Sequence, residues 1–305
     1  MSAPNIIKAA GGDWFHEIWQ GAAGGMFRVN KLLHADNSNH QNILVFENDV
    51  FGRMLAIDNV IQVAQADEFI YHEMITHVGV FAHGAVKNVL VVGGGDGGAL
   101  RELFRHQTIE RVTLVEIDQA VIDLCTEWMP MVSNGAFDDP RLNLVIGDGA
   151  AFVKETAEQF DLIIIDSTDP TGPGAALFTE EFYRDCHKAL SPAGVLVTQS
   201  GLPFVQAKEF EGAFGALSAI FKYASGCQIV VPSFWGGPMI LGFATDSTAT
   251  LSPSPATLAS RTAAASLSFR YYSAGHHRAA FQLPAYIQEM FPHADKLRNE
   301  GLIEG

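Results

Sequence analysis

One glycine-rich stretch, V-V-G-G-G-D-G-G-A-L over residues 91–100, constrains the fold more than any other segment of the chain. It follows an apolar run and precedes a helical pattern, and Gly93, Gly95 and Gly98 fit the spacing G-x-G-x-x-G. In that context the spacing predicts a tight turn between a parallel strand and a helix, at which a nucleotide-containing ligand binds. We therefore expect a parallel sheet with helices on both faces.

Alternating strand and helix patterns extend over most of the chain beyond this loop. The apolar run Leu162–Ile165 is nearly continuous, which is typical of a strand buried on both faces of a sheet. The alternation predicts an α/β fold with a doubly wound, mostly parallel sheet. The expected strands are residues 87–92, 111–117, 142–146, 160–166 and 194–199, with a further candidate at 227–232.

The N-terminal residues contain short β segments separated by turn residues, which predict a small antiparallel sheet. Such a sheet needs another surface to cover its apolar face, either the main domain or a second subunit. Apolar residues near helical spacing predict a helix over residues 67–82. The expected β segments are His16–Gln20, Met26–Leu33, Asn42–Glu47, Arg53–Ile57 and Val60–Val63.

These patterns predict two domains, a small β domain over residues 1–65 and a Rossmann-like catalytic domain with a C-terminal extension over residues 66–305. Residues 244–268 are rich in Ala, Ser, Thr and Pro, which predicts a surface loop with one short helix. The tail that follows regains aromatic side chains, and we expect it to pack back onto the body of the protein.

Bulk properties of the 305-residue chain limit its partners and its compartment. The formal net charge of −15 disfavours a nucleic-acid partner, because phosphates bind basic surfaces. No apolar run approaches the roughly 20 residues of a membrane helix, and the first residues lack a signal-peptide pattern, so we expect a cytoplasmic protein without a membrane partner. Cys125, Cys186 and Cys227 are widely spaced and are expected to be reduced and buried.

An acid inside the glycine loop, Asp96, distinguishes between two kinds of ligand. The loop and Glu116, about 20 residues downstream, suit either NAD or S-adenosylmethionine, because both carry a ribose. A pyrophosphate on the loop would be repelled by the Asp96 carboxylate, whereas a sulfonium or an ammonium group would be attracted to it. Alternatively, Asp96 caps the following helix.

Further acids follow the later strands of the predicted sheet. Asp148 follows the third strand, and Asp166 and Asp169 follow the fourth, in D-S-T-D-P-T-G-P-G. The carboxyl ends of parallel strands meet at one rim, so we expect these acids to face the same crevice as Asp96 and Glu116. A negative crevice suits an amine, and a positioned carboxylate is a suitable base for it. Alternatively, Asp148 caps a helix, and the loop from Asp166 is a plain turn or a lid.

Two histidine patterns do not fit a metal site. In H-E-M-I-T-H the residues His72 and His77 are five apart and leave the common helix face that H-E-x-x-H needs, so no metal is expected. His276 and His277 have no carboxylate or cysteine nearby in sequence, and we expect them at the surface.

Six motifs in order, spread over residues 14–290, resemble the spermidine synthases, a family of polyamine aminopropyltransferases. They are G-G-G-D-G-G, V-E-I-D, G-D-G, D-S-T-D-P-x-G-P, A-D-E-F-I-Y-H-E-M and R-Y-Y…A-A-F-x-L-P. The resemblance implies a Rossmann-like domain of the class I methyltransferase type, preceded by a small β domain that contributes to a homodimer or homotetramer. It also implies aminopropyl transfer from decarboxylated S-adenosylmethionine, a co-substrate, to putrescine, with no metal and no cofactor.

The resemblance also implies a role for individual residues. Asp166 is the base that accepts the proton of the attacking amine, and Asp169 helps to hold the far amine of putrescine. Asp96 binds the aminopropyl amine, Glu116 the ribose and Asp148 the adenine. The implied donor site comprises Gln41, Gly93, Gly95, Asp96, Glu116, Asp148 and Gly149, and the implied acceptor site comprises Gln62, Tyr71, His72, Asp96, Asp169, Gln199 and Phe234.

One departure from the family pattern concerns the acceptor. In V-P-S-F-W-G-G, Phe234 stands where the family commonly has a tyrosine, so another diamine or agmatine is an alternative acceptor. Two further hypotheses share the fold: a methyltransferase that uses intact S-adenosylmethionine, and a polyamine-binding protein without catalysis.

Overall fold

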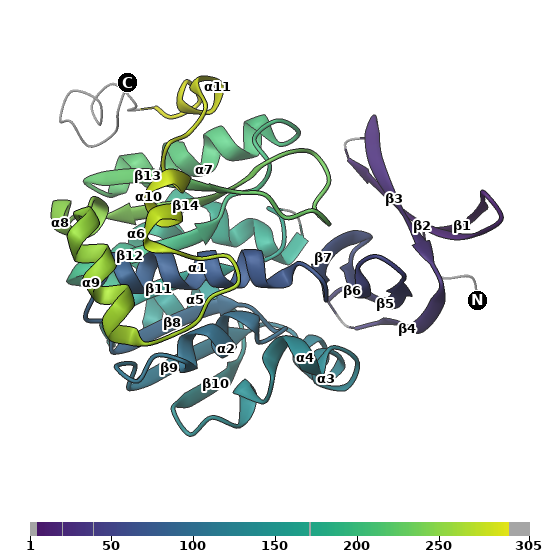
Figure 1. Cartoon of the computed structure of the whole chain (residues 1–305), viewed down its shortest axis with the longest axis horizontal. Coiled ribbons are helices and arrows are strands. Elements are labelled where there is room, and N and C mark those ends of the chain that lie inside the picture. Colours follow the sequence, from purple (N-terminus) through teal and green to yellow (C-terminus); the bar gives the residue numbers. More distant parts are fainter. Residues whose placement is uncertain (1–4, 20, 39, 171, 293–305) are drawn as a thin grey trace.

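A central sheet with helices on both faces forms the body of the protein (Figure 1). The computed structural model describes residues 5–19, 21–38, 40–170 and 172–292. The sheet has seven strands in the order β10-β9-β8-β11-β12-β14-β13. Its strands are β8 Asn88–Gly93, β9 Arg111–Glu116, β10 Leu142–Ile146, β11 Phe160–Asp166, β12 Leu190–Gln199, β13 Tyr223–Ile229 and β14 Met239–Thr245. The predicted α/β class is confirmed.

The chain reverses its direction across the sheet at β8. It runs from β8 outward to β9 and β10, and then returns to place β11 and β12 on the other side of β8. All five of these strands pair in parallel, so their carboxyl ends meet at one rim. A crevice opens at such a reversal, which places a ligand site beside the last residues of β8 and β11.

Two strands of the sheet differ from the sequence-based expectation. The predicted strand 227–232 is β13, which begins earlier, at Tyr223, and pairs antiparallel with β14. No strand was predicted for β14, which lies between β12 and β13 and is buried along its whole length. The predicted loop 244–268 begins inside β14 and contains two helices, α8 Thr248–Leu251 and α9 Pro255–Ala265, where one was expected.

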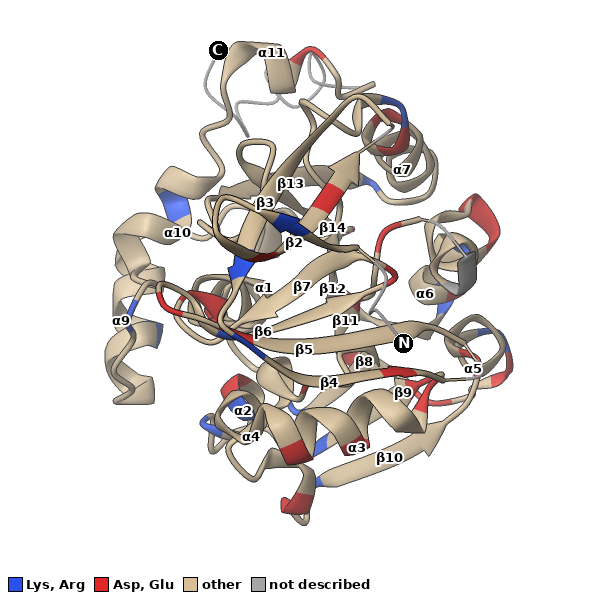
Figure 2. Ribbon diagram, turned by 90° about the vertical axis from the view of Figure 1, so that its right-hand side faces the viewer, with Lys and Arg blue, Asp and Glu red and all other residues tan. Residues whose placement is uncertain are grey.

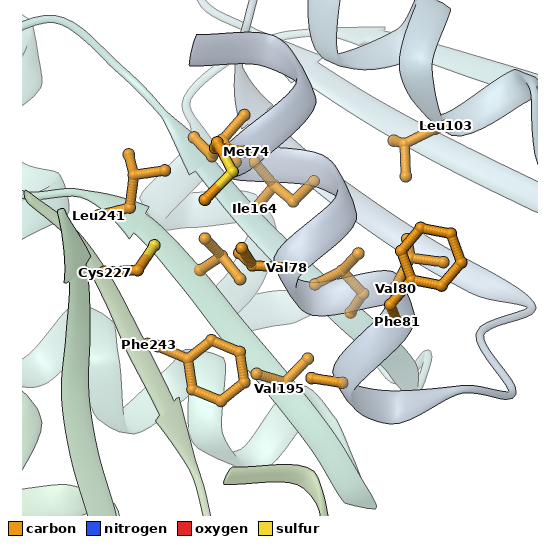
Figure 3. Packing of buried hydrophobic residues seen from close by; sticks show 14 of the residues in the cluster. Met74, Val78, Val80, Phe81, Leu103, Ile164, Val195, Cys227, Leu241 and Phe243 are labelled. Carbon is orange, nitrogen blue, oxygen red and sulfur yellow. The ribbon is translucent and has the colours of Figure 1, made fainter. Parts of the chain in front are cut away.

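The helix α1, Glu68–His83, packs across one face of the sheet (Figure 3). Met74 and Val78 are fully buried and lie in one apolar cluster with Ile164 of β11 and Leu241 of β14. The helix ends at Gly84, whose φ of 79° is favourable for glycine. The other helices are α2 Gly98–Phe104, α3 Gln119–Trp128, α4 Pro130–Ser133, α5 Gly149–Glu155, α6 Glu180–Ala189, α7 Ala207–Ile220, α8 Thr248–Leu251, α9 Pro255–Ala265, α10 Ala274–Ala280 and α11 Ala285–Gln288, with 3-10 turns at Ala136–Asp138 and Gly172–Phe178.

Two small antiparallel sheets precede α1, where the sequence predicted one. Their strands are β1 Ile6–Ala9, β2 Gly12–Trp19 and β3 Ala23–Val29 in one sheet, and β4 Lys31–Asn37, β5 Asn42–Asn48, β6 Gly52–Ile57 and β7 Val60–Ala64 in the other. The predicted segment Met26–Leu33 is thus two strands that meet at Asn30, and β1 was not predicted. The sheet β4–β7 lies in front of the ends of β8, β11 and β12 in Figure 2 and packs on α3. The exact division at residue 65 stays a prediction.

The C-terminal segment returns to the body as expected, since Tyr272 and Ala280 are buried in the cluster beneath α1. His277 is buried as well, at 2% exposure, which corrects its expected surface position. The ring of His277 is shielded from solvent because it packs between Tyr272 and Phe281. Its Nδ1 forms a hydrogen bond with the hydroxyl of Tyr272 at 2.9 Å. Cys125, Cys186 and Cys227 are buried free thiols, as predicted. In the described part of the chain, no helix has the length and apolar character needed to cross a lipid bilayer.

Candidate active site

Most of the predicted site residues line one cavity at the rim where the carboxyl ends of the parallel strands meet. It is closed on one side by β2, β6 and β7 and on the other by the ends of β8, β9, β11 and β12. The predicted residues that line it are Gln41, Gln62, Tyr71, Gly93, Gly95, Asp96, Glu116, Asp148, Gly149, Asp166, Asp169, Gln199 and Phe234.

The glycine loop is held against the end of β11. Gly93 has a φ of +80°, and a Cβ there would lie 2.2 Å from the backbone oxygen of Asp166. The next amide, Gly94 N, donates to that same oxygen at 2.7 Å. Any side chain at position 93 would therefore push the loop away from Asp166, which explains why the loop begins with glycine.

Asp96 lies in the glycine loop between β8 and α2 and lines the cavity. Its Oδ1 accepts a hydrogen bond from Gly98 N at 2.6 Å, so the predicted interaction with the start of α2 is present, although Gly97 is the N-cap residue. His72 Nε2 lies 3.3 Å from the same oxygen. Burial raises the pKa of Asp96, but the positive charge of His72 and its contact outweigh burial, and the net pKa is lowered. Asp96 therefore remains ionised near neutral pH.

Asp166 has the environment of a base. The hydroxyl of Tyr71 donates to Asp166 Oδ1 at 2.7 Å, whereas Oδ2 is buried without a hydrogen-bond partner among the described residues. Burial and the negative charge of Asp96 raise the pKa of Asp166 to about 6, against the opposing effects of His72 and Tyr71. The carboxylate is consequently ionised at pH 7 and above, with one oxygen available to accept a proton.

Glu116 and Asp148 also line the cavity, and the carboxylate of each accepts hydrogen bonds from backbone amides. Glu116 Oε1 accepts from Asp118 N at 2.9 Å, and burial is the main cause that raises the pKa of Glu116 to about 7. Asp148 Oδ1 accepts from Ala150 N at 2.8 Å, so its predicted helix-capping role is present alongside its place in the cavity.

The loop after β11 is tied to the loop after β12 by a glutamine that the motif analysis did not single out. Gln206 Nε2 donates to Asp169 Oδ1 at 2.9 Å, and Gln206 Oε1 accepts from Leu202 N at 2.7 Å. Burial raises the pKa of Asp169, against the hydrogen bonds from Gln206 and Gln199. The bridge fixes Asp169 at one end of the cavity.

The N-terminal sheet also supplies residues that the sequence did not reveal. Glu17 and Trp19 of β2 line the cavity, and Trp19 Nε1 donates to the Glu17 carboxylate. Glu17 Oε2 accepts from Ile61 N at 3.0 Å, and burial raises the pKa of Glu17. The cavity thus has a further carboxylate, close enough to Asp169 for their charges to interact.

His72 differs from the other predicted acceptor residues in its position. It is 1% exposed and lies behind Asp96, and it is not among the described residues that line the cavity. Its Nδ1 is 2.6 Å from Glu68 Oε2. Direct contact between His72 and the acceptor stays a prediction; in the structure, His72 reaches the site through Asp96.

Metal binding is not indicated in the described part of the chain, where no three His, Cys, Asp or Glu side chains are grouped closely enough to hold an ion. His72 and His77 face different partners, since His77 Nε2 contacts Glu102 Oε2 at 3.0 Å.

Comparison with known proteins gives consistent matches over nearly the whole chain. The family model "Spermine/spermidine synthase domain" matches residues 68–253, and "Spermidine synthase tetramerisation domain" matches residues 13–65. A polyamine aminopropyltransferase of Ruegeria sp. (strain TM1040) is 50% identical over 87% of this chain and 93% of its own length. One from Pseudomonas syringae pv. tomato is 47% identical over 90% of this chain and 96% of its own length.

Two solved structures are similar in fold as well as in sequence. A spermidine synthase in complex with the transition-state analogue AdoDATO superposes with a TM-score of 0.86 at 35% identity, covering 91% of this chain and 94% of that one. The spermidine synthase of Thermotoga maritima superposes with a TM-score of 0.84 at 33% identity, covering 91% and 93%.

Proposed function

The chain belongs to the spermine/spermidine synthase family of polyamine aminopropyltransferases, and from that premise we propose that it uses decarboxylated S-adenosylmethionine and putrescine. The products would be spermidine and methylthioadenosine. The observation that supports these substrates best is the set of acids on one cavity, namely Asp96, Glu116, Asp148, Asp166 and Asp169. A cavity lined by these carboxylates attracts cationic ligands and repels anionic ones.

The position of Asp96 supports the decarboxylated donor. S-adenosylmethionine carries a carboxylate beside its amine, and that carboxylate would approach an ionised acid at the floor of the loop. The decarboxylated form carries the amine and the sulfonium alone, both of which Asp96 attracts. Selectivity thus comes from repulsion of the wrong donor as well as from attraction of the right one.

The transfer is a displacement at the carbon next to sulfur. A bond forms between the amine nitrogen of putrescine and that carbon, while the carbon–sulfur bond breaks and its electron pair neutralises the sulfonium. The nitrogen releases a proton, for which the free Oδ2 of Asp166 is the suitable acceptor. Because the step needs neither a hydride nor a Lewis acid, we propose that the protein works without a cofactor, by positioning and electrostatics.

The far end of the acceptor is assigned to Asp169, which Gln206 fixes in place at 2.9 Å. The distance between this acid and Asp166 sets the diamine length that fits, so cadaverine or agmatine are the alternatives to putrescine. A methyltransferase would prefer intact S-adenosylmethionine, and a binding protein would hold polyamine without releasing methylthioadenosine.

The experiment that tests the proposal is a competition assay read by mass spectrometry. The protein is given decarboxylated S-adenosylmethionine with putrescine, cadaverine, agmatine and spermidine in equal amounts. Methylthioadenosine with mainly spermidine is the expected result. A different aminopropylated product would keep the reaction and change the acceptor, and the absence of methylthioadenosine with every amine would contradict aminopropyl transfer.

Replacing Phe234 by tyrosine tests the acceptor end of the site. Phe234 lines the cavity, and its ring lies edge-to-face with Tyr71, with centroids 6.2 Å apart. A new hydrogen bond to the amine is expected to lower the KM for putrescine about 2- to 10-fold. Steady-state kinetics with varied putrescine measure this, and a raised KM would mean that the hydroxyl crowds the acceptor.

Replacing Tyr71 by phenylalanine tests the environment of Asp166. The substitution removes a donor that favours the ionised carboxylate, so the pKa of Asp166 is expected to rise further above its ordinary value. The acid side of the pH profile of kcat/KM should then move to higher pH. Tyr272→Phe is the control, because it removes a buried hydroxyl whose partner is His277. An unmoved profile would show that Asp166 does not govern the acid side.

We also propose that the chain forms a homodimer or homotetramer through its N-terminal strands. Residues 13–65 match a model described as a tetramerisation domain, and the sheet β1–β3 exposes Ile7, Ile18 and Met26. Exposed apolar side chains grouped on one sheet are typical of an interface. Light scattering coupled to size-exclusion chromatography determines the mass in solution.

A further inference from the structure

A buried network of charged side chains extends from Asp96 away from the cavity. His72 stands between two carboxylates: its Nδ1 is 2.6 Å from Glu68 Oε2, and its Nε2 is 3.3 Å from Asp96 Oδ1. The shorter contact is a hydrogen bond, and the longer one is an ion-pair contact. A neutral imidazole has one N–H, so only the imidazolium can direct a proton towards both acids.

Glu68 is in turn held by a bidentate pair with Arg101. Arg101 Nη1 donates to Glu68 Oε1 at 3.0 Å, and Nη2 donates to Oε2 at 2.8 Å. Arg101 also donates to the backbone oxygen of Val132 at 2.6 Å and to Glu102 Oε1 at 2.9 Å. The two hydrogen bonds to Glu68, together with those to Val132 and Glu102, fix the orientation of the guanidinium. The charge of Arg101 therefore holds the Glu68 carboxylate in position and keeps it ionised.

Neither Glu68 nor Arg101 is among the described residues that line the active-site cavity. Both lie behind His72, and Glu68 is 8% exposed. The network contacts Asp96 through one imidazole ring, and the positive charge of Arg101 also lowers the pKa of Asp96. Gly98 makes room for that ring, since a Cβ there would lie 2.3 Å from His72 Cε1.

We propose that Glu68 and Arg101 are positioning residues for donor recognition: they hold His72 as an imidazolium, which keeps Asp96 ionised and in place for the aminopropyl amine of the donor. The inference rests on the proposed function, because it assigns a cause to the charge of an acid already placed in the donor site. It adds two residues to which the sequence analysis assigned no role and which are not among the described residues that line the cavity.

The electrostatics of the cluster agree with this assignment. Burial lowers the pKa of His72, but the two neighbouring carboxylates outweigh burial and raise it to about 10. The pKa of Glu68 is lowered, because His72 and Arg101 outweigh the effect of its burial. Without the Glu68 charge, the pKa of His72 would fall, and the positive charge that faces Asp96 would be held less firmly.

The test compares two ligands across two matched variants. Decarboxylated S-adenosylmethionine carries the aminopropyl amine, whereas methylthioadenosine lacks it and reports only on the adenosine part of the site. Glu68→Gln removes the charge next to His72. Glu73→Gln is the control, because Glu73 is an equally buried carboxylate on α1 that accepts hydrogen bonds from the backbone amides of Arg270, Tyr271 and Tyr272 instead.

Binding is measured by titration calorimetry on the full-length protein. For Glu68→Gln we expect the Kd of decarboxylated S-adenosylmethionine to rise about 10-fold or more, with the Kd of methylthioadenosine nearly unchanged. For Glu73→Gln we expect the ratio of the two Kd values to stay that of the unchanged protein. Equal weakening of both ligands in Glu68→Gln, or no weakening of either, would overturn the inference.

A second variant covers the case in which Glu68→Gln does not fold. Arg101→Lys keeps the positive charge but cannot form the bidentate pair and reach Val132 at once, so it should raise the same Kd ratio by a smaller factor. An unchanged ratio in this variant would overturn the inference equally. Failure of the proposed function would be recognised by a different result. In that case the unchanged protein would show no preference for decarboxylated S-adenosylmethionine over the intact form.

Discussion

Asp166→Asn is expected to lower the turnover of the protein by about 10²- to 10⁴-fold, the usual contribution of a positioned base. Asparagine keeps the size of the side chain and can still accept from Tyr71, but its amide cannot take up a proton. In the unchanged protein, Oδ2 of Asp166 has no hydrogen-bond partner among the described residues and can receive the proton of the acceptor amine. In the variant, the amine would have no carboxylate oxygen to which it could release that proton. Methylthioadenosine release at saturating substrate measures the loss, and donor affinity should change little.

The pH dependence of the unchanged protein gives an independent check. With the pKa of Asp166 raised to about 6 by burial and by Asp96, the base is ionised above that pH and protonated below it. Turnover attributable to Asp166 should therefore fall as the pH falls through about 6, and the residual activity of Asp166→Asn should lack this step.

Asp161→Asn is the matched control for this prediction. Asp161 lies on the same strand, β11, but near its other end, where Oδ2 accepts from Lys87 N at 2.9 Å and Asn88 N at 3.1 Å. Its replacement should leave turnover per folded molecule unchanged. Near-normal turnover in Asp166→Asn, or an equal loss in Asp161→Asn, would rule out Asp166 as the base.

The second large effect is expected at Asp96. Asp96→Asn removes the charge that attracts the aminopropyl amine, so the Kd for decarboxylated S-adenosylmethionine should rise about 10- to 100-fold, as for a lost hydrogen bond between charged groups. Intact S-adenosylmethionine should bind no worse, and its carboxylate should no longer be repelled. The preference for the decarboxylated donor is therefore expected to shrink or vanish.

Direct titrations with both donors measure this change. Thermal unfolding has to be followed in parallel, because the substitution leaves His72 with one counter-charge fewer in a buried site. A lower melting temperature with an unchanged preference between the two donors would show that Asp96 has a structural role only. A lost preference in a protein that remains folded would support its assignment to donor selection.

Much of the fold could be predicted because it depends on local patterns. The apolar run Leu162–Ile165 is β11, with each of its side chains fully buried, and helix α1 begins and ends within two residues of its prediction. The strand β14 was missed, although Met239–Thr245 is an apolar run that follows W-G-G-P, a pattern consistent with a buried strand. Its place between β12 and β13 has no local signal, because it depends on pairing with β12, which is distant in the chain.

The site shows the same division. Asp96, Glu116, Asp148 and Asp166 each lie at or just after the carboxyl end of a parallel strand, so the geometry of the sheet brings them to one rim, and the sequence was enough to group them. Glu17 and Gln206 reach the cavity because a separate sheet and a separate loop pack against that rim. No spacing in the sequence records that packing.

The sequence by itself determined the sheet, the rim and the acids on it, because strand periodicity and the glycine loop are properties of neighbouring residues. Only the tertiary structure decided the charge state of these acids. The pKa of Asp96 is lowered and that of Asp166 is raised, although both carboxylates line the same rim and burial acts to raise the pKa of each. The difference arises from the position of His72 beside Asp96, held by Glu68 and Arg101 from two helices. Such charges act through space, over distances set by the fold.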